Sequence, residues 1–115
     1  GGWRNLDRVV WGMRARPDRT LCLALVHHVV ISANIPLRGF IGWLAGRSVQ
    51  LIIEYVSRSD EKVKTLLRNK EDKYSDYSRR SLEASLERHY EIIRSQSLES
   101  GNRYLYWCRL PKPGD

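Results

Sequence analysis

Two adjacent histidines and a nearby glutamate are the first candidates for chemistry in this sequence. His27 and His28 come directly after the apolar run 20–26, and Glu54 lies within a second apolar run, 49–56. Imidazole ordinarily titrates near neutral pH, so either histidine could act as a base or orient a substrate. We therefore take His27, His28 and Glu54 as candidate catalytic residues.

Three further polar residues lie near these candidates along the chain. Asn34 ends a short polar break, and Arg58 and Asp60 follow the second apolar run. Ligands of open α/β sheets bind beyond the carboxyl ends of the strands, so we expect Asn34, Arg58 and Asp60 to contact a substrate. A plainer alternative stays open, in which one histidine packs in the core and the other forms a hydrogen bond in a turn.

Metal binding and covalent catalysis are both disfavoured by the pattern. Imidazole and carboxylate are ligands for zinc, iron or manganese. Adjacent residues of an extended chain point to opposite faces, however, so we predict no metal site at His27 and His28. Cys22 and Cys108 lie inside apolar runs, where free cysteine behaves as a small buried hydrophobe. No serine stands in a nucleophile-elbow pattern.

A strand, a helix and a second strand would position the candidate residues. The near-continuous apolar run 20–26 predicts a buried parallel strand. The β-branched run 49–56 predicts a second one. Between them, Pro36 at a first helical position, apolar residues through 37–44 and a stop at Gly46 predict a crossover helix. Together they form a βαβ unit.

Further helices are predicted before and after this unit. Apolar residues recur at helical spacing over 3–13 and predict an amphipathic helix. Ser59 or Asp60 can cap a helix, because their side-chain oxygens can accept hydrogen bonds from the free amides of its first turn. Ser78 can cap another helix in the same way.

The end of the chain has the pattern of an antiparallel ribbon. Residues 90–97 and 103–110 flank the turn 99–102, whose glycine and asparagine tolerate the left-handed region. We predict a single α/β domain over residues 1–110 and a flexible tail over 111–115. The alternation of strands and helices predicts a mixed sheet with helices on both faces.

The net charge of +7 favours acidic partners such as nucleic acid. The basic residues are interleaved with acids, which is typical of an ordinary solvated surface. A basic nucleic-acid-binding or protein-interaction module remains the alternative function, with bases stacking on tyrosines expected to be exposed. These tyrosines are Tyr74, Tyr77, Tyr104 and Tyr106. We expect the four tryptophans to lie in the core.

The apolar stretches predict no membrane span. The longest, 21–31, is interrupted by His27 and His28 and is shorter than the roughly 20 apolar residues that a spanning helix needs. The start of the sequence lacks the layout of a secretory signal. We expect a reduced, cytoplasmic protein without a membrane partner.

Several of these segments, taken in order, carry a family resemblance. They are Gly2-Trp3-Arg4-Asn5, Pro17-Asp18, Leu23-Ala-Leu-Val-His-His28 and residues 51–60. Together they resemble the later half of a class I S-adenosylmethionine-dependent methyltransferase, and more narrowly a bacterial group that includes methyltransferase-like nodulation proteins of rhizobia. The resemblance implies a partial Rossmann-like sheet, S-adenosylmethionine as the cofactor and an unknown methyl acceptor. His27 and His28 would then border the cleft for methyl transfer.

The cofactor-binding elements of that family have no counterpart here. The family holds its cofactor with a glycine-rich turn after the first strand and an acidic residue after the second. No such glycine pattern occurs, and the glycines of 39–46 lie in a helical pattern. We therefore expect the C-terminal, substrate-side part of a longer protein, without activity alone. Its partners would be the rest of the parent chain and, weakly, a second copy at the exposed sheet edge.

Overall fold

A five-stranded mixed sheet is the frame of the computed structural model, which describes residues 13–16, 18–71, 74–98 and 101–111. Its strand order is β1-β2-β3-β5-β4. The strands are β1 (Arg14–Ala15), β2 (Arg19–Cys22), β3 (Gln50–Val56), β4 (Glu91–Leu98) and β5 (Arg103–Arg109). β2 and β3 are parallel, whereas the other neighbouring strands are antiparallel. The predicted mixed α/β architecture is confirmed.

The connection from β2 to β3 contains a short π-helix, η2 (His28–Ser32), and the helix α2 (Leu37–Ala45). Pro36 stands at the N-cap of α2, and Gly46 ends the helix, where its N–H donates to the carbonyl of Gly42. Phe40, Ile41 and Leu44 are fully buried, so α2 faces the hydrophobic core with its apolar stripe. The predicted βαβ unit is therefore present.

Two capped helices follow β3. They are α3 (Glu61–Arg68) and α4 (Arg79–Glu87). The Asp60 carboxylate accepts from the backbone N–H of Lys62, and the Ser78 hydroxyl accepts from that of Ser81. Both are predicted N-cap hydrogen bonds, which satisfy amides that the helix itself leaves free. No helix in the described part of the chain is long and apolar enough to cross a membrane.

The C-terminal hairpin is also confirmed. β4 and β5 pair from Glu91 opposite Arg109 to Leu98 opposite Arg103, with a bulge between Ile92 and Arg94. Gly101 adopts φ +90° beside the turn, a conformation that glycine reaches without the steric cost of a Cβ. β5 also pairs with β3, so the last strand lies between two strands that precede it in the chain.

The strand predicted over 20–26 is wrong beyond Cys22. Ala24 turns the chain with φ +53°, and the carbonyl of Leu25 then accepts from the N–H of His28 and of Val29 at 2.9 and 3.1 Å. The two histidines therefore lie in a helical turn. A continuous apolar run cannot distinguish a buried strand from a buried helix by its period, and the buried apolar residues after His28 fit a helix equally well.

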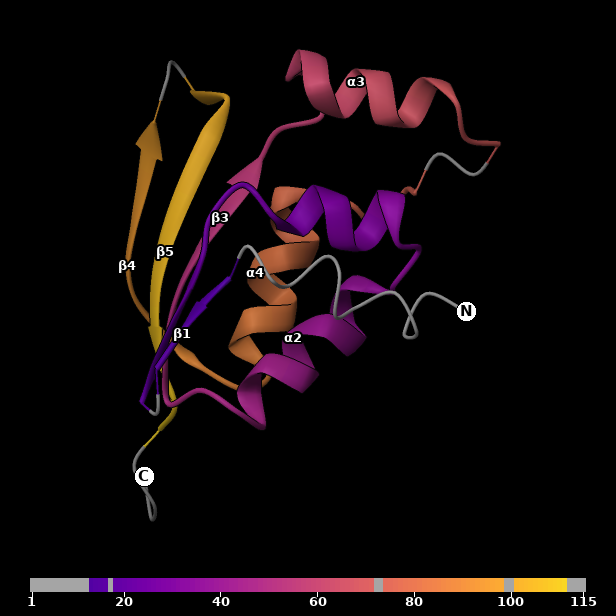
Figure 1. Ribbon diagram of the computed structural model, residues 1–115. Coiled ribbons are helices and arrows are strands. Elements are labelled where there is room, and N and C mark those ends of the chain that lie inside the picture. The colour runs from indigo at the N-terminus through magenta and orange to yellow at the C-terminus, as the bar shows by residue number, and fades with distance from the viewer. Residues whose placement is uncertain (1–12, 17, 72–73, 99–100, 112–115) are drawn as a thin grey trace.

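The described helices all lie on one side of the sheet (Figure 1). Leu51, Ile53 and Tyr55 of β3 point to that side and are buried. The prediction of helices on both faces is thus wrong for the part of the chain that the structure describes. The tryptophan prediction holds in part, because Trp43 is partly buried and packs against the core, whereas Trp107 is partly buried on the opposite face of the sheet. The helix predicted over 3–13 lies outside the described residues, except for Met13.

Candidate functional site

The carboxyl ends of β2 and β3 meet at one edge of the sheet, where Glu54 joins three segments. Its side chain is nearly buried. One carboxylate oxygen, Oε1, accepts from the N–H of Ala24 at 2.7 Å and from Arg103 Nη1 at 3.2 Å. The ion pair with Arg103 links β3 to β5, and the amide contact holds the turn that follows β2. Charge-assisted bonds of this kind are stronger than neutral ones, so Glu54 fixes the shape of this edge.

His27 is buried at the same edge. It is 3% exposed, and its Nδ1 has no hydrogen-bond partner among the described residues. Burial, and then the neighbouring His28, lower the pKa of His27 to about 4, although the Asp60 carboxylate acts in the opposite direction. The imidazole is therefore neutral at physiological pH. A catalytic base works best with a pKa near the operating pH, so the geometry favours a hydrogen-bonding role over proton abstraction.

His28 is exposed and lies beside His27, with 4.2 Å between the two ring centroids. It lines a cavity of about 300 Å³ between η2 and α3, together with Glu61, Lys62, Thr65 and Leu66. Partial burial and the Lys62 ammonium lower the pKa of His28 as well. The helical turn brings the two rings to one place, which corrects the expectation that they point to opposite faces.

The structure does not show a ligand set for a metal ion at this edge. Within the described ranges, no group of three or more His, Cys, Asp or Glu side chains is arranged to hold one.

The three predicted substrate-binding residues are dispersed. Arg58 Nη1 donates to the carbonyls of Tyr74 and Tyr77 at 2.9 and 3.0 Å and so holds that turn. Asp60 caps α3 and lies close enough to His27 to influence its pKa. Asn34 has φ +57° and lines a separate cavity of about 150 Å³ with Tyr74. Only Asp60 therefore joins the histidines and Glu54 at the edge of the sheet.

Sequence reasoning missed two members of this site, Arg103 and Lys62. Both lie close enough to His27 to lower its pKa. Lys62 could have been anticipated, because it belongs to the first turn of the helix that Asp60 caps. Arg103 could not, because its contact with Glu54 depends on β5 pairing with β3, and the hairpin pattern alone does not say which strand lies next to it.

The burial of the cysteines agrees with the prediction from the sequence, whereas the burial of the tyrosines does not. Cys22 and Cys108 are buried as predicted, and burial raises the pKa of each thiol to about 12. The expectation of a surface formed by four exposed tyrosines is wrong, because Tyr74, Tyr77 and Tyr106 are buried.

Comparison with known proteins shows similarity to a nodulation protein. No protein-family model and no solved structure match this chain. The chain is similar to nodulation protein NoeA of Rhizobium meliloti (strain 1021), with 30% identity over 105 residues. These residues make up 91% of this chain and 22% of the relative, so the chain spans about a fifth of that protein. The domain described above is thus similar to one segment of a longer nodulation protein.

Proposed function

We propose that this domain is the substrate-side part of an S-adenosylmethionine-dependent, methyltransferase-like protein with a role in nodulation. The nodulation role rests on the similarity to nodulation protein NoeA. The methyltransferase part rests on the resemblance of the sequence segments, which is independent of that relative's name. The proposal concerns a longer protein, and the 115 residues alone are expected to be inactive.

One observation carries the proposal. The parallel pair β2–β3, joined through α2, is followed by a C-terminal antiparallel hairpin, which is the order of elements that the resemblance implies. Glu54 and His27 lie at the carboxyl edge of that parallel pair. This is the edge at which open α/β sheets bind their ligands.

The residues at this edge of the sheet would have different roles in methyl transfer. The imidazole of His28, which lines the cavity, would orient the methyl acceptor by a hydrogen bond. The buried ring of His27 lies beside it, and Glu54 would hold the turn at Ala24 in shape. The acceptor would enter the cavity that His28, Lys62 and Thr65 line. Methyl transfer requires above all that the nucleophile is held close to the methyl group and in line with it.

The described residues provide no glycine-rich turn for the cofactor. The turn after β2 runs through Leu23, Ala24 and Leu25 and contains no glycine at which a cofactor could approach the backbone closely. In the described part of the chain, glycines lie within or at the end of α2 and in the hairpin turn. S-adenosylmethionine would therefore be held mainly by other parts of the longer protein.

Binding of S-adenosylmethionine tests the proposal. We would titrate it into the isotope-labelled chain and into full-length nodulation protein NoeA, with ATP as a ligand that has the adenosine but lacks the methyl sulfonium. We expect saturable binding by the longer protein, and at most weak amide shifts around Leu25 and His28 in this chain. If the longer protein did not bind S-adenosylmethionine at millimolar concentration, the methyltransferase proposal would be abandoned.

A further inference from the structure

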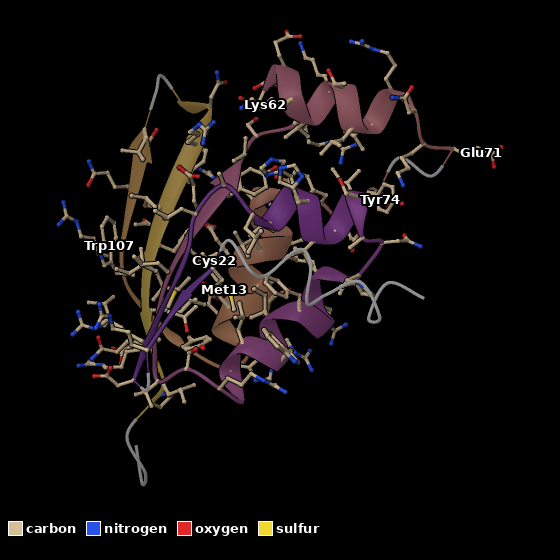
Figure 2. All side chains as sticks on the ribbon, in the orientation of Figure 1. Met13, Cys22, Lys62, Glu71, Tyr74 and Trp107 are labelled. Atoms are coloured by element: carbon tan, nitrogen blue, oxygen red, sulfur yellow. The ribbon has the colours of Figure 1, made fainter. Side chains whose placement is uncertain are left out.

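In the part of the chain that the structure describes, the face of the sheet opposite the helices is open and partly apolar. Leu21 pairs with Ile52 and Ile52 pairs with Trp107, so these three side chains form a row across β2, β3 and β5. All three are only partly buried. Figure 2 shows Trp107 on the side of the sheet that faces away from the helices. Parallel strands are almost always covered on both faces, so the face of the β2–β3 pair that no described residue covers is a candidate for a cover from outside these residues.

This face is hollowed and bordered by arginines. A depression of about 190 Å³ runs along it. Its lining includes Leu21, Ile52, Ile93, Trp107, Arg19 and Arg109. Ile93, at the bulge of β4, is 54% exposed, and Arg94 lies over the Trp107 ring at 5.0 Å from its centroid. We call these residues, with Arg94, the open face.

The charges of the open face indicate what can cover it. Arg19, Arg94 and Arg109 are exposed around the apolar row, and Glu91 lies 3.5 Å from Arg109. A second copy of the chain would bring the same arginines and the same net charge of +7, which opposes face-to-face pairing. A partner with carboxylates around an apolar strip would be complementary.

The shape favours a helix over a nucleic acid. Bases stack on flat aromatic rings. Among the described residues that line the depression, only Trp107 has an aromatic ring, and Arg94 lies over that ring. The other apolar lining is mostly leucine and isoleucine. Helices, in contrast, cover the apolar faces of sheets with stripes of side chains at i, i+3, i+4 and i+7.

We propose that the open face is a docking surface for an acidic amphipathic helix of a partner protein. The apolar stripe of that helix packs on Ile52 and Trp107, and carboxylates along its borders pair with Arg19 and Arg109. Tryptophan and arginine together are typical of the residues that dominate binding energy at protein interfaces. This inference does not rest on the proposed methyltransferase role.

Three synthetic helical peptides of about five turns test the proposal. They share one apolar stripe and carry glutamate, glutamine or lysine along its borders, and binding is followed by fluorescence anisotropy at low salt. We expect the glutamate peptide to bind about tenfold more tightly than the glutamine peptide, because each exposed ion pair contributes modestly. The lysine peptide should not bind. Amide shifts should map the glutamate peptide to β2, β3 and β5.

Variants of the chain separate the apolar row from the charges. Trp107→Ser should weaken binding of the glutamate peptide by about 30-fold, as loss of a central aromatic anchor does. The double change Arg19→Glu with Arg109→Glu should remove the preference for glutamate. The control, Arg38→Glu with Arg88→Glu, makes the same change in net charge with exposed residues of the helical layer, and should keep the preference. Circular dichroism would establish that each variant is folded.

Several results would overturn the inference. These are absence of binding by the glutamate peptide, equal binding of the glutamate and lysine peptides, or shifts that map to α2 and α4. A molecular mass that rises with concentration and returns to that of the monomer in Trp107→Ser would assign the open face to a second copy instead. Displacement of the glutamate peptide by a single-stranded RNA that shifts the same residues would assign the face to nucleic acid.

Discussion

Acidification should destabilise this domain through His27. The ordinary pKa of histidine, 6.5, applies in the unfolded chain, whereas burial lowers the pKa of His27 in the folded domain to about 4. Between these two values the unfolded state binds the proton and the folded state does not. The stabilisation is therefore fully present above pH 6.5 and is lost as the pH falls towards about 4.

The size of the effect follows from the separation of the two pKa values. Each pKa unit corresponds to about 1.4 kcal/mol. Because the pKa of His27 is 6.5 in the unfolded chain and about 4 in the folded domain, acidification can lower the unfolding free energy by at most about 3 kcal/mol through this residue. His28, whose pKa is also lowered, acts in the same direction. Domains of this size are stable by roughly 5–15 kcal/mol, so the loss should be easy to measure.

Urea unfolding followed by circular dichroism, at steps from neutral pH down to about pH 4, provides the measurement. The wild-type chain is compared with His27→Phe, which keeps a ring but cannot titrate. His89→Gln serves as the control for removing a histidine, because His89 is exposed. We expect the unfolding free energy of His27→Phe to fall less steeply with pH than that of the wild type. Parallel curves for the two proteins would refute the assignment of a buried, neutral imidazole.

Two further predictions concern buried groups away from the histidines. Tyr77→Phe should lower the unfolding free energy by about 1–2 kcal/mol, because the hydroxyl of Tyr77 donates to the backbone carbonyl of Val56, which would lose that donor. A urea midpoint equal to that of the wild type would contradict this. Cys22 and Cys108 should resist a disulfide-exchange reagent at mildly alkaline pH until urea unfolds the chain, since burial holds each thiol pKa near 12. Rapid labelling of the native protein would contradict their burial.

Local signals in the sequence predicted much of the fold. Pro36 and Gly46 bound α2, and Asp60 and Ser78 cap the helices that follow them. Gly101 lies at the turn of the hairpin. Each of these residues acts through its own backbone or through an amide within three positions, so its effect can be inferred without knowing the rest of the molecule.

The residues of the site were harder to predict from the sequence, because they come together only through tertiary contacts. Glu54 and Arg103 come together only because β5 pairs with β3 in the observed register. His27 lies at the carboxyl edge, but in a helical turn and not on extended chain after a strand, because an apolar run gives no indication that Ala24 reverses the chain. The open face was missed for a similar reason, since the run through β3 looks equally apolar on both sides.

The position of β5 between β3 and β4 has a consequence for the order of folding. β4 has no described neighbour in the sheet except β5, so it cannot join the sheet until β5 has been synthesised. β3 can pair with β2 as soon as it is made, but its second neighbour, β5, lies about fifty positions further along the chain. On the ribosome, the unit formed by β2, α2 and β3 can assemble first and then present an unsatisfied strand edge. Cooperative closure of the sheet is thus delayed until the final strand has emerged.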